Sequence, residues 1–408
     1  MHGSPATVVV VGASVAGVRA CRALRSEGFA GRVVLVGDED ELPYDKPPLS
    51  KQYLAGSFDR DRLTLIDEAQ AARAGIDMRL GTAAADLDVA CRRVVLSDGS
   101  VLGYEACVIA TGATARPSPW AASSGVHLLR SRTDSHSLRS VLTPGANVAV
   151  VGCGFIGAEV ASTATALGCR VTAVDPLAVP IAAIVGEEVG GLLSAAHERH
   201  RVSTRFGVGV SSLDGEAGSL DLTLTDGTHL RADVAVVGIG AQPNVGWLAS
   251  SGLLLEDGVV CDEYCSPAPG VYAAGDVARW LHRRHGSRVR VEHWTNAVEQ
   301  AACVAHNIVH PEDLRAYEPV EYLWSDQYDL KIQVVGHPEQ GTARRVVGST
   351  SAPARFAALF ADSRGRLQGA VTVNWPWALV ESRRLVAAAG RLDAWADRLA
   401  GAVVPAGR

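Results

Sequence analysis

The stretch VVGCGFIGAE at residues 150–159 is the clearest structural motif of this chain. It joins an apolar run to glycines at 152, 154 and 157, and then to a helical pattern. In such a turn the first glycine allows the tight bend, the second lets the backbone approach a pyrophosphate, and the third lets the helix pack on the strand. The free N–H groups at the helix start face the phosphates. We therefore predict a dinucleotide site at Gly152, Gly154 and Gly157.

A second, weaker copy of this pattern is VVVVGASVAG at residues 8–17. It has the form G-x-S-x-A-G, because Ser14 stands where the middle glycine is expected. A lone pattern of this kind can also be a plain structural turn. The apolar strand predicted at 32–36, and the acid that follows it, favour a second dinucleotide site. We assign that site to Gly12, Ser14, Ala16 and Gly17.

An acidic residue follows the second strand of each predicted unit, Asp38 in the first and Asp175 in the second. A carboxylate at this place accepts hydrogen bonds from the adenosine ribose and repels a 2′-phosphate. The presence of Asp175 therefore predicts that the second site binds NADH rather than NADPH. The alternative is a solvated acid at a strand end. No arginine follows Asp175 until Arg199, so we expect modest affinity for the cofactor.

The repeated pattern of strand, glycine turn, helix and strand predicts an α/β fold with two doubly wound dinucleotide-binding domains. Beyond Pro319 the chain carries aromatic residues and short strand patterns before a final helix, which indicates a separate C-terminal α+β domain. The predicted domains are residues 1–115 with 241–320, residues 116–240, and residues 321–408.

Composition narrows the class of protein. Of 408 residues 48% are hydrophobic and 20% charged, with a net charge of −6, which is typical of a soluble protein and argues against nucleic-acid binding. We find no long apolar run and no secretory leader pattern, and the eight cysteines form no CxxC pair, so we expect a cytoplasmic protein with reduced thiols and no membrane association. The pairs His197-x-x-His200 and His282-x-x-His285 lack further ligands at metal spacing. We expect both on the surface and predict no metal site.

Several motifs occur in one order along nearly the whole chain. Beside the two glycine turns they are LPYDKPPLSK (42–51), ATGATARP (110–117), LLRSRTD (128–134), VGIGAQPN (237–244), VYAAGDVA (271–278), VEHWTNAVEQ (291–300) and YLWSDQYDLKIQ (322–333). With these motifs the chain resembles the FAD-dependent NADH:ferredoxin reductases, the putidaredoxin-reductase-like group of the glutathione-reductase-type fold. The resemblance implies FAD in the first dinucleotide site and NADH in the second.

The resemblance also implies two catalytic residues. Lys51 ends the PPLSK stretch and resembles the lysine beside the reactive N5 of the flavin. Glu159 lies in the first turn of the second predicted helix and resembles the glutamate that pairs with this lysine at the nicotinamide. The alternatives are a surface charge for Lys51 and an ordinary first-turn acid for Glu159, which the helix dipole favours by roughly 0.3–1 kcal/mol.

Four further residues resemble FAD contacts of the family. Asp276 resembles the acid that holds the ribityl chain, and we expect the helix that follows it to point its N-terminus at the flavin. Arg130 resembles an arginine that contacts FAD, with an inter-domain ion pair as the alternative. Trp294 and Trp324 resemble aromatics that flank the flavin ring, with packing in the core as the alternative.

The function implied is electron transfer from NADH through FAD to a [2Fe-2S] ferredoxin that supplies an oxygenase, by a monomer or weak homodimer. A rubredoxin reductase and a non-catalytic flavin-dependent binding module stay open as alternatives. A disulfide or peroxide reductase needs a cysteine beside the flavin, and no cysteine lies between Asp38 and Lys51.

One basic segment lies between two of the expected flavin contacts. Residues 278–294 carry Arg279, His282 and His285 besides four arginines that we predict to dock the ferredoxin. Acidic ferredoxins are steered and oriented by such a patch, whereas the alternative is a solvated loop. The predicted docking residues are Arg283, Arg284, Arg288 and Arg290.

Overall fold

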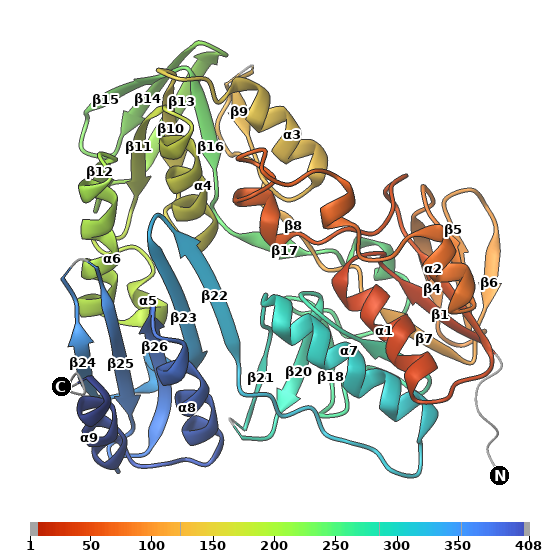
Figure 1. Ribbon diagram of the computed structural model, residues 1–408. Helices are drawn as coiled ribbons and strands as arrows, with labels where there is room; N and C mark the ends of the chain where they lie inside the picture. The colour runs from red at the N-terminus through yellow and green to blue at the C-terminus, as the bar shows by residue number, and fades with distance from the viewer. Residues whose placement is uncertain (1–6, 123, 285, 352, 404–408) are drawn as a thin grey trace. The chain divides into compact units, whose positions relative to one another are not determined.

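The computed structural model describes residues 7–122, 124–284, 286–351 and 353–403. The chain forms two compact units, and it passes from one to the other several times (Figure 1). Unit 1 comprises Met1–Lys46, Asp59–Thr114 and Ala241–Pro319, and unit 2 comprises Pro47–Phe58, Ala115–Gly240 and Val320–Arg408. The division into three domains stays a prediction.

Unit 1 is built on a parallel sheet with the strand order β19-β7-β1-β2-β3. Its central strand is a run of valines that is buried along almost its whole length, as expected for a parallel sheet covered on both faces. Val11 lies opposite Val36 on one neighbour and opposite Ile109 on the other. The strands are β1 (Thr7–Val11), β2 (Arg32–Val36), β3 (Ile76–Arg79), β7 (Ala106–Ile109) and β19 (Val271–Ala273).

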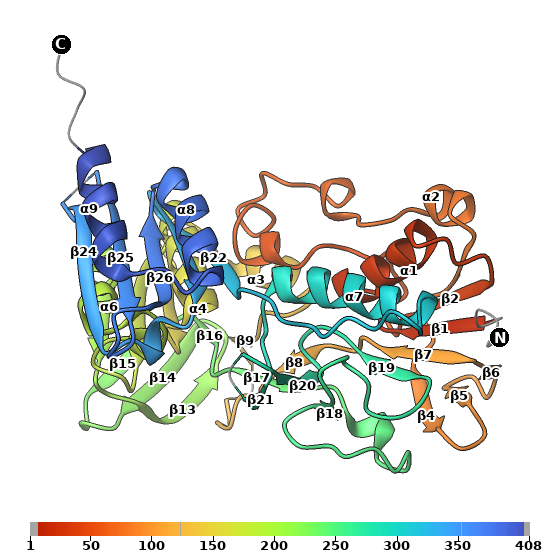
Figure 2. The same cartoon turned by 90° about the horizontal axis from the view of Figure 1, so that it is seen from below.

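Two helices of unit 1 pack along each other beside this sheet, as both views show (Figures 1 and 2). They are α1 (Val15–Ser26), which buries small residues such as Ala16 and Ala20, and α7 (Trp294–Val309). The other elements are α2 (Glu68–Arg73), the hairpin strands β4 (Ala84–Asp88), β5 (Arg93–Leu96) and β6 (Val101–Gly103), the strands β18 (Val259–Cys261), β20 (Ala278–His282) and β21 (Ser287–Val289), and two 3-10 helices (Asp61–Leu63 and Gly246–Leu248).

Unit 2 repeats the same pattern in a parallel sheet with the order β12-β11-β10-β16-β9. Val151 lies opposite Val174, as Val11 lies opposite Val36 in unit 1. The elements are α3 (Arg132–Val141), α4 (Phe155–Ala166), α5 (Ala182–Val185), α6 (Glu187–Arg199), β9 (Val126–His127), β10 (Asn147–Val151), β11 (Arg170–Asp175), β12 (Ser203–Phe206), β13 (Val210–Glu216), β14 (Ser219–Leu224), β15 (His229–Ala232) and β16 (Val234–Val237). The 3-10 helix η1 (Pro47–Ser50) belongs to this unit as well.

The C-terminal part of unit 2 is an antiparallel sheet with the order β22-β23-β26-β25-β24. Its side chains alternate between two cores: Val335 and Leu359 pack with α8 and α9, whereas Val334 and Ala358 pack with α6. This second core joins the C-terminal sheet to α6, and both belong to unit 2. The elements are β22 (Tyr322–Gln327), β23 (Leu330–Gly336), β24 (Ala343–Ser349), β25 (Arg355–Ala361), β26 (Leu367–Val373), α8 (Pro376–Ala387), α9 (Leu392–Val403) and a 3-10 helix (Pro338–Gln340).

The segment after Asp276 differs from our expectation. We expected a helix to follow this acid, but the next elements are the strands β20 and β21, and α7 begins only at Trp294. Trp280 and His282 point into the core of unit 1 and are fully buried. The short strands β8 (Ala113–Ala115) and β17 (Ala241–Pro243) lie near points where the chain passes between the units. No helix within the described ranges is long and apolar enough to cross a membrane.

Candidate active site

The first glycine turn joins β1 to α1 in unit 1. Gly12 has φ +116°, and a Cβ built there would lie 2.2 Å from the carbonyl oxygen of Ala110. A Cβ on Gly17 would lie 1.9 Å from the carbonyl oxygen of Gly12, so α1 can approach the strand only because this residue has no side chain. Ser14 is the N-cap of α1 in extended conformation, and Ala16 is buried in the first turn. The turn is therefore built as the glycine pattern predicts.

The second turn joins β10 to α4 in unit 2 with the same construction. A Cβ on Gly152 would lie 2.3 Å from the oxygen of Gly238, and one on Gly157 would lie 2.0 Å from the oxygen of Gly152. Gly154 is different, because a Cβ there would meet nothing within 4 Å. The open side of Gly154 leaves room for a phosphate against the first N–H groups of α4, which have no partner inside the helix. These residues fit a bound dinucleotide.

The two predicted ribose acids are not equivalent in the structure. Asp175 is the last residue of β11 and is only 7% exposed; its carboxylate accepts hydrogen bonds from the backbone N–H of Cys153 (2.8 Å) and of Leu177 (2.9 Å). By strand register the residue of unit 1 at the same place is Gly37, and Asp38 lies one position further and is exposed. The acid in unit 2 thus braces its own glycine turn, whereas Asp38 is left facing solvent.

Lys51 and Glu159 both belong to unit 2 and form a buried ion pair. Lys51 Nζ lies 2.7 Å from Glu159 Oε2, with side-chain exposures of 11% and 2%. Glu159 is the fifth residue of α4 and lies just past the first turn, in which we had expected it, because the helix begins already at Phe155. Lys51 follows η1. Removing two charges from water is costly unless each meets a partner. The pair therefore occupies a site whose other polar groups must also be satisfied.

Two serines complete the partners of the Glu159 carboxylate, and sequence reasoning did not select either one. The Ser325 hydroxyl donates to Oε1 at 2.7 Å, and the Ser50 hydroxyl donates to Oε2. Both serines are buried, at 0% and 3% exposure. Both serines lie inside motifs quoted above, YLWSDQYDLKIQ and LPYDKPPLSK. The motifs therefore pointed to these segments of the chain, but they did not single out either serine.

Further side chains hold the segment that carries Lys51 in place. Thr163 of α4 donates to the carbonyl of Ser50 at 2.8 Å, and Ser135 of α3 donates to the carbonyl of Leu49 at 2.7 Å. Gln327 donates to Ser325 at 3.1 Å. The lysine is thus supported by side chains from α3, α4 and β22, all within unit 2.

Two predicted FAD contacts lie in unit 1. The Trp294 indole N–H donates to Asp45 Oδ1 at 2.7 Å, and Arg19 lies over its ring at 5.9 Å from the centroid. Trp294 is half-buried at the first position of α7 and is therefore not packed in the core. Asp276 is half-buried after β19, and its carbonyl accepts from Arg290 at 3.2 Å.

The other two predicted FAD contacts lie in unit 2. Arg130 is half-buried just before α3, and its backbone N–H donates to Asp134 Oδ2 at 3.0 Å. Trp324 is half-buried on β22, where its ring stacks near that of Tyr322 with centroids 6.1 Å apart. Neither side chain is part of a closed core.

A buried polar cluster beside the second glycine turn was not expected. His197, which we expected on the surface, is buried and lies between the Cys153 thiol (3.5 Å) and the Tyr328 hydroxyl (2.7 Å). Burial lowers the pKa of His197 to about 4 and raises the pKa of Cys153 to about 12. Both groups are therefore neutral near pH 7, and Cys153 is not a thiolate nucleophile. His200 stacks on Tyr328 and is partly exposed.

The basic segment is a pair of antiparallel strands rather than a loop, and part of its charge is already paired. Arg283 lies 2.9 Å from Glu263 Oε1, and Arg290 lies 3.1 Å from Asp257 and 2.6 Å from Glu292. Arg290 is only 12% exposed, whereas Arg284 and Arg288 are exposed. His282 is buried, contrary to our expectation, and His285 lies outside the described residues.

Family comparisons agree with this arrangement of turns. The model of the pyridine nucleotide-disulphide oxidoreductases matches residues 6–301, and that of the reductase C-terminal domain matches residues 322–403. The chain is 36% identical to the ferredoxin–NAD(+) reductase component of the anthranilate 1,2-dioxygenase system of Burkholderia cepacia, covering 94% of this chain and 95% of that one. It is 35% identical to rhodocoxin reductase of Rhodococcus erythropolis, covering 93% and 89%.

Solved structures show the same similarity. The ferredoxin reductase for the CYP199A2 system from Rhodopseudomonas palustris superposes with a TM-score of 0.91 at 32% identity, covering 95% of this chain and 96% of that one. The covalent putidaredoxin reductase–putidaredoxin complex gives a TM-score of 0.89 at 30% identity, covering 99% and 100%.

The chain belongs to the pyridine nucleotide-disulphide oxidoreductase family. Within that family it groups with the ferredoxin–NAD(+) reductases, flavoproteins that use FAD and NADH. The predicted family, fold class, enzyme class and cofactors are thereby confirmed.

Proposed function

We propose that this protein passes electrons from NADH through FAD to a [2Fe-2S] ferredoxin that supplies an oxygenase. The observation that carries the proposal is that one chain folds two glycine turns of the same construction, each before a helix N-terminus. Relatives named as reductase components of dioxygenase systems, and the putidaredoxin reductase–putidaredoxin complex, support a ferredoxin as the acceptor. FAD, when bound, accepts two electrons together and releases them singly, which suits an iron–sulfur acceptor.

The residues divide between the two cofactors according to the turns and the family resemblance. Gly154 leaves the open space where the NADH phosphates fit, and the half-buried Trp294 and Asp276 are accessible to a ligand. We assign FAD to Gly12, Ser14, Ala16, Gly17, Asp38, Lys51, Arg130, Asp276, Trp294 and Trp324, and NADH to Gly152, Gly154, Gly157, Glu159 and Asp175.

Lys51 and Glu159 act as a positioning pair in this proposal. The carboxylate of Glu159 holds the Lys51 ammonium at one place, and the two serine hydroxyls hold the carboxylate in turn. A charge that is fixed by the fold before the cofactors bind costs no reorganisation when they react. The chain thereby presents a preorganised cation next to the helix that begins at the NADH turn.

For the ferredoxin we propose the surface of the β20–β21 hairpin, with Arg284 and Arg288 as the main docking residues. Both are exposed, whereas Arg283 shares its charge with Glu263 and Arg290 is half-buried between two carboxylates. Complementary charge raises the association rate and orients the partner more than it adds affinity. Arg283 and Arg290 then serve mainly to hold the hairpin.

The experiment that tests this proposal measures NADH-dependent reduction of a [2Fe-2S] ferredoxin at several salt concentrations. We expect the double variant Arg284→Glu/Arg288→Glu to be slower at low salt, with a flatter dependence on ionic strength. Its NADH oxidation with ferricyanide should stay near wild type. The matched control Arg73→Glu/Arg199→Glu reverses two exposed helical charges elsewhere and should resemble wild type with both acceptors. Equal losses with both acceptors would contradict docking at the hairpin.

We also propose a cytoplasmic location and a monomer or weak homodimer. All eight cysteines, which lie in the described parts of the chain, are free thiols, as is usual in a reducing compartment. Light scattering of the purified protein tests the oligomeric state, and a stable higher oligomer would contradict it.

A further inference from the structure

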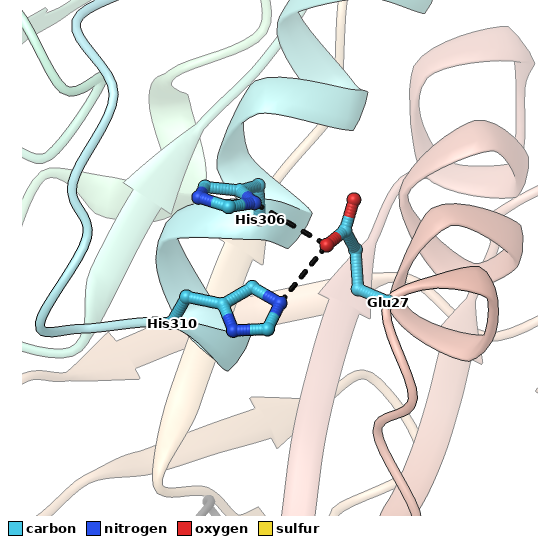
Figure 3. Close-up of side chains that lie close together, drawn as sticks. All are labelled: Glu27, His306 and His310. Carbon is cyan, nitrogen blue, oxygen red and sulfur yellow. Dashed lines mark hydrogen bonds and ion pairs between the residues drawn. The ribbon is translucent and has the colours of Figure 1, made fainter.

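Two histidines and a glutamate meet at the C-terminal ends of the paired helices of unit 1. His306 lies in the last turn of α7, His310 is its C-cap, and Glu27 is the C-cap of α1. Figure 3 shows both imidazole rings directed at the same carboxylate oxygen: His306 Nδ1 is 3.3 Å and His310 Nε2 is 3.0 Å from Glu27 Oε2. The three candidate ligand atoms all lie within 4.8 Å of one another.

The hydrogen bonds of His306 indicate which of its two ring nitrogens carries the proton. Its Nε2 lies 2.9 Å from the carbonyl oxygen of Asp313, and because a carbonyl only accepts, Nε2 carries the proton. In the neutral ring Nδ1 then has a lone pair, and it faces the carboxylate of Glu27. Two acceptors at this distance require either a proton or a metal ion between them.

We propose that Glu27, His306 and His310 bind a divalent transition metal ion such as Zn²⁺. For zinc–ligand bonds of about 2.0–2.1 Å, the edge of a tetrahedron is roughly 3.3 Å. The two ring-to-carboxylate separations, 3.3 and 3.0 Å, are close to that edge. Two imidazoles and one carboxylate are a set of ligands that zinc accepts, with water in the fourth position.

The surroundings of the cluster suit a cation. The bond from His306 Nε2 to a backbone carbonyl is the kind of outer contact that orients a metal-binding histidine. Two helix C-termini meet here, and their dipoles favour positive charge. His306 is only 6% exposed, whereas His310 and Glu27 are 42% and 34% exposed, so an ion and its water can enter from solvent.

Such an ion would tie the end of α1 to the end of α7, independently of the reductase activity. We did not predict this group of ligands from the sequence, since Glu27 lies 279 residues before His306 and only the fold brings them together. The pair His306-x-x-x-His310 has the i, i+4 spacing that places two imidazoles on one helix face.

The proposal is tested by titrating the FAD-loaded protein, treated with EDTA and then desalted, with ZnCl₂ in a calorimeter. We expect one Zn²⁺ per chain at this site, a rise in Tm with Zn²⁺, and neither effect with MgCl₂, which prefers oxygen ligands in octahedral geometry. His310→Ala removes a partly exposed ligand and should weaken Zn²⁺ binding at least tenfold. Its flavin spectrum and its Tm without metal should stay near wild type.

His229→Ala is the matched control, because His229 Nδ1 also contacts a carboxylate, Asp221, at 3.2 Å but is in no three-ligand group within the described residues. It should bind Zn²⁺ as the wild type does. No saturable binding to the wild type would overturn the proposal and would assign the charge between His306 and Glu27 to a second ring proton. Equal affinity of His310→Ala and wild type would overturn it as well.

Discussion

Lys51 Nζ and Glu159 Oε2 are 2.7 Å apart, although the residues are 108 positions apart in sequence. Glu159 is 2% exposed, and both of its oxygens are engaged, one by Ser325 and the other by Lys51 and Ser50. The effect of the helix dipole falls off within the first turn, and Glu159 lies just past that turn of α4. The dipole therefore does not explain why this acid is buried with a lysine and two hydroxyls. The arrangement therefore favours a role of this pair in the reaction with NADH.

The first prediction concerns Glu159→Gln, which keeps the shape of the side chain but leaves Lys51 without its counter-charge. We expect flavin reduction by NADH, measured by stopped flow, to slow by roughly tenfold or more, which is about 1.4 kcal/mol in the barrier. The free energy of unfolding should fall by about 3–5 kcal/mol, because one buried charge loses its partner.

The control for this variant is Glu187→Gln, which changes an exposed acid in the first turn of α6. It should cost only roughly 0.3–1 kcal/mol of stability and leave flavin reduction unchanged. If Glu159→Gln matched this control in rate, Glu159 would have no role in flavin reduction.

The second prediction concerns the hydrogen bond that Ser325 of β22 gives to Glu159 Oε1. Ser325→Ala leaves a buried carboxylate oxygen without its donor, so urea unfolding should show a loss of about 1–3 kcal/mol. Ser382 is also fully buried, but its hydroxyl has no hydrogen-bond partner within the described structure. Ser382→Ala should therefore be neutral or slightly stabilising, and similar losses in the two variants would show that this bond contributes nothing specific.

The third prediction is about cofactor choice. Asp175→Ala should raise the KM for NADH roughly tenfold, with a smaller change in kcat, because the ribose loses a charged acceptor. It should also reduce the preference for NADH over NADPH. Asp221→Ala removes an exposed acid from the same unit and should change neither quantity. A wild-type protein that used NADPH as well as NADH would contradict the role of Asp175.

The fourth prediction is a pH dependence of stability. Burial alone would lower the pKa of His337, but hydrogen bonds and charge from Glu321 and Glu339 outweigh it and raise the pKa to about 10. Because the folded pKa lies above the unfolded value of about 6.5, the stabilisation is complete below pH 6.5 and is lost as pH rises towards 10.

The free energy of unfolding of His337→Gln should accordingly differ most from that of the wild type at pH 6 and least near pH 10. The contacts involved are 3.1 Å to Glu321 and 2.6 Å to Glu339, at the ends of β22 and β23. A difference between wild type and variant that is constant over this pH range would contradict the assignment.

The parts of the site that depend on local sequence could be predicted. Gly12, Gly17, Gly152 and Gly157 each stand where a Cβ would collide with backbone, so a pattern over a few residues was sufficient. The one-residue offset between Asp38 and Asp175 was not predicted. The offset depends on how long the turns before β2 and β11 are. The number of residues between each glycine turn and its acid does not show these lengths.

Contacts between distant segments could not be predicted from local patterns. Ser325 reaches Glu159 only because β22 packs beside α4, and His197 is buried only because Tyr328 follows that strand. We expected a helix after Asp276, because the arginines and histidines of this segment hid the alternation of a strand. In β20 the first, third and fifth residues, Ala278, Trp280 and His282, all point inward.

Trp375 belongs to the C-terminal core of unit 2, whereas the neighbouring Trp377 is 38% exposed. Trp377 lies 6.3 Å from Trp375 and 5.5 Å from Trp395 between ring centroids. Trp375 and Trp395 are 1% and 2% exposed. Their role is packing between the C-terminal sheet and its two helices.

The simplest test of electron transfer through this chain is to mix the purified protein with NADH without oxygen and to follow its flavin absorbance. We expect one non-covalently bound FAD per chain, whose absorbance bleaches with NADH faster than with NADPH and returns when a [2Fe-2S] ferredoxin is added. A protein that takes up no FAD, or whose bound FAD is not reduced by NADH, would show that two dinucleotide sites on this chain do not exchange electrons.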